Sequence, residues 1–75
     1  MKTIYILHEA HSLCDYNEHE IFKSYEKAKW FFDLTKSTIS SRNDIEEVYT
    51  DEDEEYYVKI DGDSIRLYIT EHTID

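Results

Sequence analysis

Two kinds of hydrophobic pattern divide the chain, one with the period of an α-helix and the other with the period of a β-strand. Residues 25–38 are predicted to form the helix, because their apolar positions recur three or four residues apart. The stripe consists of Tyr25, Ala28, Phe31, Phe32 and either Thr35 or Ile39. Ser24 directly precedes it, and its side-chain oxygen is expected to cap free amides of the first turn.

Two strands are predicted before the helix. Residues 3–8 form the first strand, and its apolar side chains on both faces place it inside the sheet rather than at an edge. Residues 9–18 are polar and are predicted to be a loop. Residues 19–23 are predicted to be a short second strand that completes a hairpin with the first.

After the helix, the segments 45–50, 56–60 and 65–70 have strand character, and Asp61-Gly62 between the last two predicts a tight hairpin turn. The expected fold is a two-layer α+β domain, ββαβββ or βαβββ, in which an antiparallel sheet of four to five strands packs on one helix. A chain of 75 residues has room for one domain, residues 1–75.

Negative charge is concentrated in one part of the chain. Residues 44–63 contain ten acidic residues against one base, Lys59, and this segment accounts for nearly all of the net charge of −10. Repulsion among these carboxylates opposes folding, so the fold itself does not require them. Two interpretations stay open: the acids serve solubility, or they face a positively charged partner.

The composition argues against several classes of function. A single glycine leaves no glycine-rich phosphate-binding loop, and the net charge opposes direct binding to nucleic acid or to anionic membranes. No apolar stretch approaches the roughly 20 residues of a membrane span. Cys14 is the only cysteine, which excludes an intrachain disulfide and suits a reducing compartment. A cytoplasmic protein is expected.

Candidate metal ligands occur in two places, and neither matches a known pattern. His8, His11, Cys14 and His19 lie within twelve residues, but their spacing fits no standard zinc site. The acids from Asp51 onward resemble a calcium loop without its glycine at the sixth position and its glutamate at the twelfth. We therefore predict no metal, no cofactor and no enzymatic activity.

The acidic segment is predicted to bind a partner. In an extended strand, acids two residues apart lie on one face about 6.6 Å apart, so a row of them can imitate the phosphates of a nucleic acid. Neighbouring tyrosines add rigid contact area. The candidate residues are Glu46, Glu47, Tyr49, Asp51, Glu52, Asp53, Glu54, Glu55, Tyr56 and Tyr57. The expected partner is a basic nucleic-acid-binding protein or a nuclease complex.

In size and composition the chain resembles the small acidic inhibitors of phages and mobile elements, such as anti-CRISPR and anti-restriction proteins that mimic DNA. The resemblance rests on the short length, the acidic run 44–55, the tyrosines and the lack of a catalytic motif. It implies an inhibitor that acts in the cytoplasm of the host cell and blocks the nucleic-acid groove of a CRISPR effector or restriction nuclease. The alternative is a small homodimeric structural or regulatory module that pairs through an open sheet edge, with the acids serving solubility.

Overall fold

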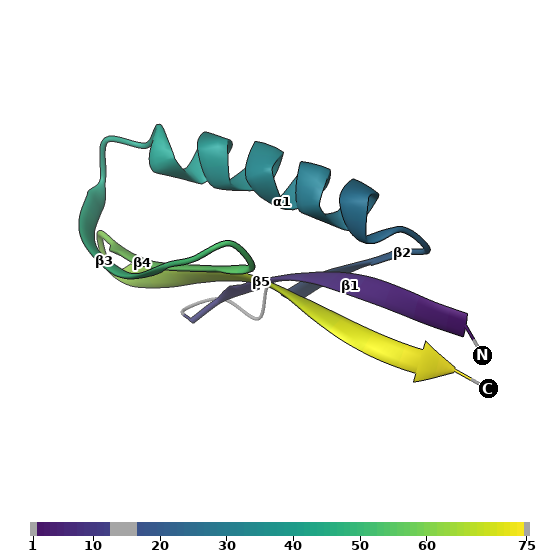
Figure 1. The fold of residues 1–75 in the computed structure, drawn as a ribbon. Helices are drawn as coiled ribbons and strands as arrows, with labels where there is room; N and C mark the ends of the chain where they lie inside the picture. Colours follow the sequence, from purple (N-terminus) through teal and green to yellow (C-terminus); the bar gives the residue numbers. More distant parts are fainter. Residues whose placement is uncertain (1, 13–16, 75) are drawn as a thin grey trace.

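A computed structural model describes residues 2–12 and 17–74 of the protein. It contains one helix and five strands, in the order ββαβββ (Figure 1). The elements are β1 (Lys2–His11), β2 (Asn17–Phe22), α1 (Tyr25–Ser40), β3 (Ile45–Asp51), β4 (Glu55–Ile60) and β5 (Asp63–Ile74). Within the described residues, no helix is long and apolar enough to cross a membrane.

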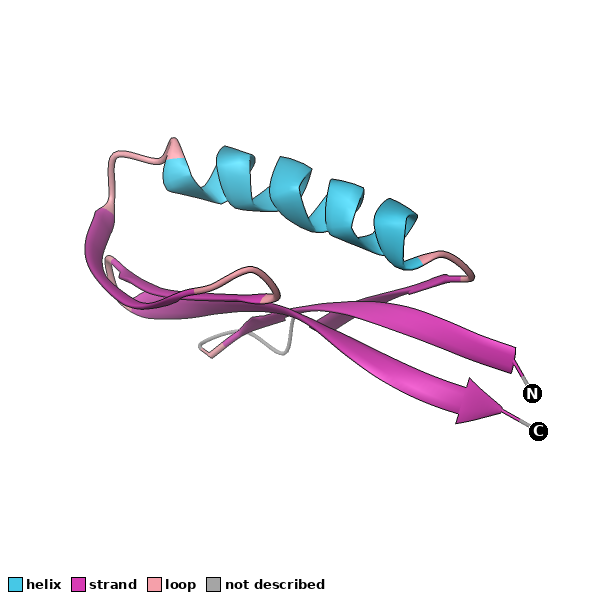
Figure 2. Ribbon diagram, viewed as in Figure 1, coloured by secondary structure: helices cyan, strands magenta, loops and turns pink. Residues whose placement is uncertain are grey.

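The five strands form one antiparallel sheet in the order β2-β1-β5-β4-β3, and α1 packs across one of its faces (Figure 2). This confirms the predicted two-layer α+β architecture and the internal position of the first strand. The last strand of the chain, β5, lies in the centre of the sheet and joins the β1–β2 hairpin to the β3–β4 hairpin. Strands β2 and β3 form the two edges.

The hydrophobic core lies between α1 and the sheet. Its buried members are Leu7, Ala28, Phe32, Ile39, Tyr56, Val58, Ile60, Ile65, Leu67 and Ile69. Odd-numbered residues of β5 and even-numbered residues of β4 face the helix because side chains alternate along a strand and the two strands pair in register, with Val58 opposite Ile65. The predicted apolar stripe of the helix supplies the other wall of this core.

The helix begins where the sequence predicts. The side-chain oxygen of Ser24 accepts a hydrogen bond from the backbone N–H of Lys27 at 3.4 Å, and Ser24 itself has extended backbone angles. Ala28 and Phe32 are fully buried, whereas Trp30 and Leu34 lie on the outer side of the helix. The end of the helix has no glycine, and the hydroxyl of Ser41 donates to the backbone carbonyl of Thr38 instead.

The loop predicted at residues 9–18 is wrong at both of its ends. Strand β1 continues to His11 and β2 begins at Asn17, while residues 13–16 of the predicted loop lie outside the described residues. The reason is tertiary pairing: β5 supplies hydrogen-bonding partners as far as the pair His11–Ile65. Polar residues are therefore held in a strand by a ladder that their local sequence does not indicate.

The Asp61-Gly62 hairpin is confirmed, with Ile60 paired to Asp63 across a two-residue turn. Gly62 has a positive φ of 76°, whereas Asp61 does not need one. The freedom of glycine is thus used at one turn position and not at two.

The sheet has a second face that no element of the described chain covers. We call it the uncovered face. Its side chains come from all five strands and include Ile4, Ile6, His8, Ala10, His19, Ile21, Tyr49, Tyr57, Arg66, Tyr68, Thr70 and His72. An antiparallel sheet tolerates one face in water, so this arrangement is compatible with a stable fold.

Candidate partner-binding surface

The acidic residues lie along one edge of the sheet and in the turn that follows it. Strand β3 is an edge strand and ends at Asp51, and residues 52–54 turn into β4. The backbone N–H of Glu52 donates to the carbonyl of Glu55 at 2.8 Å, and the N–H of Ile69 donates to the carbonyl of Glu54 at 3.0 Å. The predicted row of alternating acids on a strand at 51–55 is therefore wrong, because β5 fixes this segment as a turn.

Three of the candidate acids are held by bases of the protein itself. Asp51 forms an ion pair with Lys36 of the helix, and Glu46 with Lys59 at 3.7 Å between side-chain oxygen and nitrogen. Glu55 accepts a hydrogen bond from the guanidinium of Arg66 at 2.7 Å. These pairs are largely solvent-exposed, so each stabilises the fold only slightly.

The other acids keep more of their charge available to a partner. Glu47, Glu52 and Asp53 are exposed, and none of them forms an ion pair with a described residue. Glu54 is exposed and accepts a hydrogen bond from the hydroxyl of Tyr25 at 3.3 Å. The turn therefore presents successive carboxylates with no cation between them.

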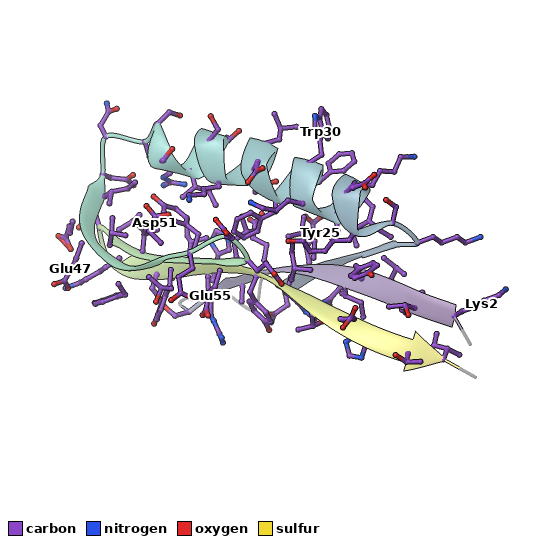
Figure 3. All side chains as sticks on the ribbon, in the orientation of Figure 1. Lys2, Tyr25, Trp30, Glu47, Asp51 and Glu55 are labelled. Carbon is purple, nitrogen blue, oxygen red and sulfur yellow. The ribbon has the colours of Figure 1, made fainter. Side chains whose placement is uncertain are left out.

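The candidate acids occupy two sides of the molecule. In Figure 3, Asp51 lies on the helix side of the sheet, and Glu47 and Glu55 lie on the opposite side. The β3 edge and its turn separate these two groups. A groove that received all of them would have to enclose this edge, with the turn pointing inward.

The three candidate tyrosines do not act together. Tyr56 is only 3% exposed and belongs to the core, with the ammonium of Lys36 5.3 Å from its ring centroid, so its predicted partner contact is wrong. It was misassigned because it follows the acids directly, whereas the alternation of β4 turns it inward. Tyr49 and Tyr57 pack against each other on the uncovered face, with ring centroids 4.9 Å apart.

Tyr25 is the residue of this surface that the sequence analysis missed, since it was placed in the apolar stripe of the helix. It stands at the start of α1, its ring contacts Tyr5, and its hydroxyl reaches Glu54. Burial, and next the negative charge of Glu54, raise the pKa of the Tyr25 hydroxyl above its ordinary value. Tyr25 therefore stays protonated and can keep donating to the acidic turn. The helical period predicts the place of Tyr25 on the helix. Its contact with Glu54 depends on the fold and could not be predicted.

The candidate zinc ligands are divided between the two faces of the sheet. His11 is on the helix side, where Glu9 lies 3.0 Å and Asp63 3.4 Å from its ring nitrogens. His8 and His19 meet on the uncovered face. Cys14 lies outside the described residues. Within residues 2–12 and 17–74 there is no group of three or more side chains placed to hold a metal ion.

His8 is the centre of a hydrogen-bonded chain on the uncovered face. Its Nδ1 is 2.8 Å from Nδ1 of His19, and its Nε2 is 2.7 Å from the hydroxyl of Thr70, which in turn lies 2.9 Å from Nε2 of His72. The ring of His8 also stacks on Tyr68. Only one of two Nδ1 atoms in hydrogen-bond contact can carry a proton there, so His8 and His19 cannot both be charged while this contact exists.

This geometry predicts a loss of stability in mild acid. Burial, then the positive charges of His19, His72 and Arg66, lower the pKa of His8. The unfolded chain then binds more protons than the folded one, so the contribution of His8 is complete above its ordinary pKa of about 6.5 and is lost as the pH falls from there through the lower pKa of the folded state. Between about pH 7.5 and about pH 5.5, the urea midpoint of the wild type should fall more than that of His8→Asn.

The carboxylates titrate in both the wild type and His8→Asn. The difference between the two urea midpoints therefore isolates the contribution of His8. Parallel midpoints over the whole pH range would contradict the assignment of this effect to His8.

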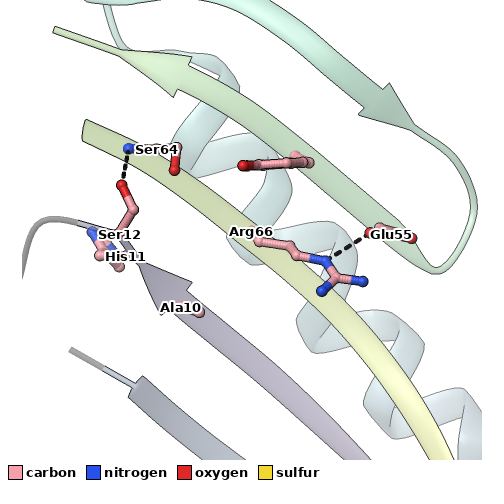
Figure 4. Close-up of a pocket in the computed structure, with 7 residues that line it drawn as sticks. Ala10, His11, Ser12, Glu55, Ser64 and Arg66 are labelled. Atoms are coloured by element: carbon pink, nitrogen blue, oxygen red, sulfur yellow. Dashed lines mark hydrogen bonds and ion pairs between the residues drawn. The ribbon is translucent and has the colours of Figure 1, made fainter. Parts of the chain in front are cut away.

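A shallow hollow of about 460 Å³ also opens on the uncovered face, between Ala10, Tyr57 and Arg66 (Figure 4). The ion pair between Arg66 and Glu55 crosses its rim, and Ser12 accepts a hydrogen bond from the backbone N–H of Ser64 at 3.2 Å. Its charged groups are thus already paired with each other. The hollow is less suited to an ionic ligand than the acidic turn is to a basic one.

Comparison of the chain with models of known protein families, with curated proteins and with solved structures gives no match. Any function must therefore be argued from the geometry of the chain.

Proposed function

We propose that this protein is a non-enzymatic inhibitor that inserts its acidic edge into the basic nucleic-acid-binding groove of a partner, such as a CRISPR effector or a restriction nuclease. The acidic edge is strand β3 together with the turn at residues 52–54. The observation that carries the proposal is the exposed turn between β3 and β4. Glu52 and Asp53 project there without an ion pair to a described residue, and Glu47 lies on the adjoining edge strand, five residues before Glu52. A groove lined by Arg and Lys supplies the charges that this edge lacks.

The shape of the edge supports the same proposal. The turn has only three residues, and the hydroxyl of Tyr25 at the start of α1 donates to the carboxylate of its last residue, Glu54. The turn is also held in place by the hydrogen bond from Ile69 to Glu54, so little ordering is required when it binds. Occupation of the groove is sufficient for inhibition, and no bond has to be made or broken.

The proposal places the protein in the cytoplasm of a cell that contains such a partner. Opposite charges steer the association, which makes it fast and sensitive to salt. The first experiment is therefore affinity capture of partners from a host-type lysate, at low and at high salt. Wild-type protein is expected to retain a basic nucleic-acid-handling protein at low salt and to release it at high salt.

The bait should be compared with two variants of equal net charge. The first is Glu47→Gln/Glu52→Gln/Asp53→Asn, and it should retain markedly less of the basic protein than the wild type does. The second, Glu18→Gln/Glu20→Gln/Glu71→Gln, removes three exposed acids from other strands and should retain it. Equal capture by all three baits, or capture of no basic protein, would refute the proposed role of the acidic edge.

A further inference from the structure

The uncovered face is rich in apolar and aromatic side chains for a surface in contact with water. Ile6 lies opposite Ile21 on the neighbouring strand, and Ile21 is 66% exposed. Further along the sheet, Tyr68 stacks on His8 and lies under the guanidinium of Arg66, 4.3 Å from its ring centroid. Contiguous apolar patches of this kind on a small protein commonly mark a surface of association.

This face is also nearly free of the charge that characterises the rest of the molecule. It carries three bases, Lys2, Lys59 and Arg66, and three acids, Glu46, Glu47 and Glu55, so its charges cancel in a chain of −10. A strongly basic partner gains little electrostatic attraction from this face. Two copies of an acidic chain, in contrast, repel each other least through this surface.

The polar groups of the uncovered face are distributed so that it can complement itself. The acids lie toward the β3 edge, and the imidazoles of His8 and His19 lie on β1 and β2 toward the other edge. A two-fold axis parallel to the strands would place β3 of one copy over β2 of the other. The His19 imidazole of each copy would then face the acidic strand β3 of its partner, and the two acidic edges would lie on opposite sides of the pair.

The face is large enough for a stable dimer. The molecule measures 43 × 22 × 16 Å, and the longest strand, β5, has 12 residues. The five strands contain 41 residues, each covering about 3.3 Å along the strand and about 4.8 Å across it, so the face offers on the order of 650 Å². Specific interfaces bury roughly 600–1,000 Å² on each partner. Sheets that pack face to face in this way lie about 10 Å apart, with interdigitated side chains.

We propose that a second copy of this chain packs on the uncovered face, so that the protein is a two-fold symmetric dimer with a helix on each outer side and an acidic edge at each end. The proposal is independent of the identity of any basic partner. It differs from pairing through the open β2 edge, because the contact centres on β5, two strands from either edge. Tyr68 lies at this centre, opposite His8 and Glu55.

The test is the molar mass in solution, measured by light scattering and by sedimentation at roughly 100 μM, a concentration suited to interfaces of this size. The wild type is expected at twice the chain mass of 9.1 kDa. Tyr68→Glu should be monomeric, with an unchanged far-UV CD spectrum. If Tyr68→Glu does not fold, Ile21→Asp provides the same test, since Ile21 makes little contact with its own chain.

Leu34→Glu is the matched control, because Leu34 is an exposed apolar residue on the outer side of the helix and should leave the dimer intact. A monomeric wild type would overturn the proposal. So would a folded Tyr68→Glu or Ile21→Asp that stays dimeric. Dimerisation that survives in Tyr68→Glu and is lost in Ile21→Asp would show pairing through the β2 edge instead.

Discussion

Phe32→Ala is expected to lower the free energy of unfolding by about 3–5 kcal/mol, which is the usual cost of deleting a buried phenylalanine ring. Phe32 has no exposed surface and belongs, with Val58, Ile65 and Leu67, to the buried cluster between helix and sheet. A domain of this size has a total stability of roughly 4–11 kcal/mol. The loss is therefore a large fraction of the total stability, and the urea midpoint of the variant should fall well below that of the wild type. Urea titration followed by far-UV CD measures the change.

Trp30→Ala is the matched control for Phe32→Ala. It deletes a larger aromatic ring from the same helix, but Trp30 is 60% exposed, so its loss should cost less than about 1 kcal/mol. Comparable losses in the two variants would show that the buried face of the helix is not the one that Phe32 occupies.

Neutralising the acidic edge is expected to weaken the proposed complex with a captured basic partner about tenfold. Glu47, Glu52 and Asp53 have no cation among the described residues, so their substitution leaves the internal ion pairs intact. Each exposed charge pair across an interface contributes roughly 0.5 kcal/mol, and three together give about 1.4 kcal/mol, a factor of ten in Kd. Most of the loss should appear in the association rate.

Surface plasmon resonance at several salt concentrations tests this directly. The triple variant should show a smaller decrease of affinity with salt than the wild type, because fewer charges are involved. The equally charged variant Glu18→Gln/Glu20→Gln/Glu71→Gln should match the wild type. If both variants weaken binding equally, the net charge of the protein and not its acidic edge determines the affinity.

The features that follow local rules could be predicted from the sequence. The cap at Ser24, the stripe through Ala28 and Phe32, and the Asp61-Gly62 turn each depend on residues within a few positions of one another. The alternation in β4 and β5 likewise gives the correct buried face of both strands. From these the class and the layers follow, whereas the sequence leaves the number of strands at four or five.

The features that depend on distant pairing could not be predicted. The acids at 51–55 have neither glycine nor proline to indicate a turn, and it is the backbone of Ile69 that holds Glu54 there. The extension of β1 to His11 likewise depends on β5. Strand order decides which histidines meet, so proximity in sequence wrongly grouped His11 with His8 and His19.

The central position of β5 has a consequence for synthesis of the protein. Until β5 has been translated, β1 and β4 each lack the neighbour that they have in the finished sheet, because β5 is the one described strand that pairs with both hairpins. Because β5 is the last strand of the chain, both hairpins are made before the strand that joins them. A chain in which β5 has not yet paired carries two open strand edges, which favour pairing with other chains.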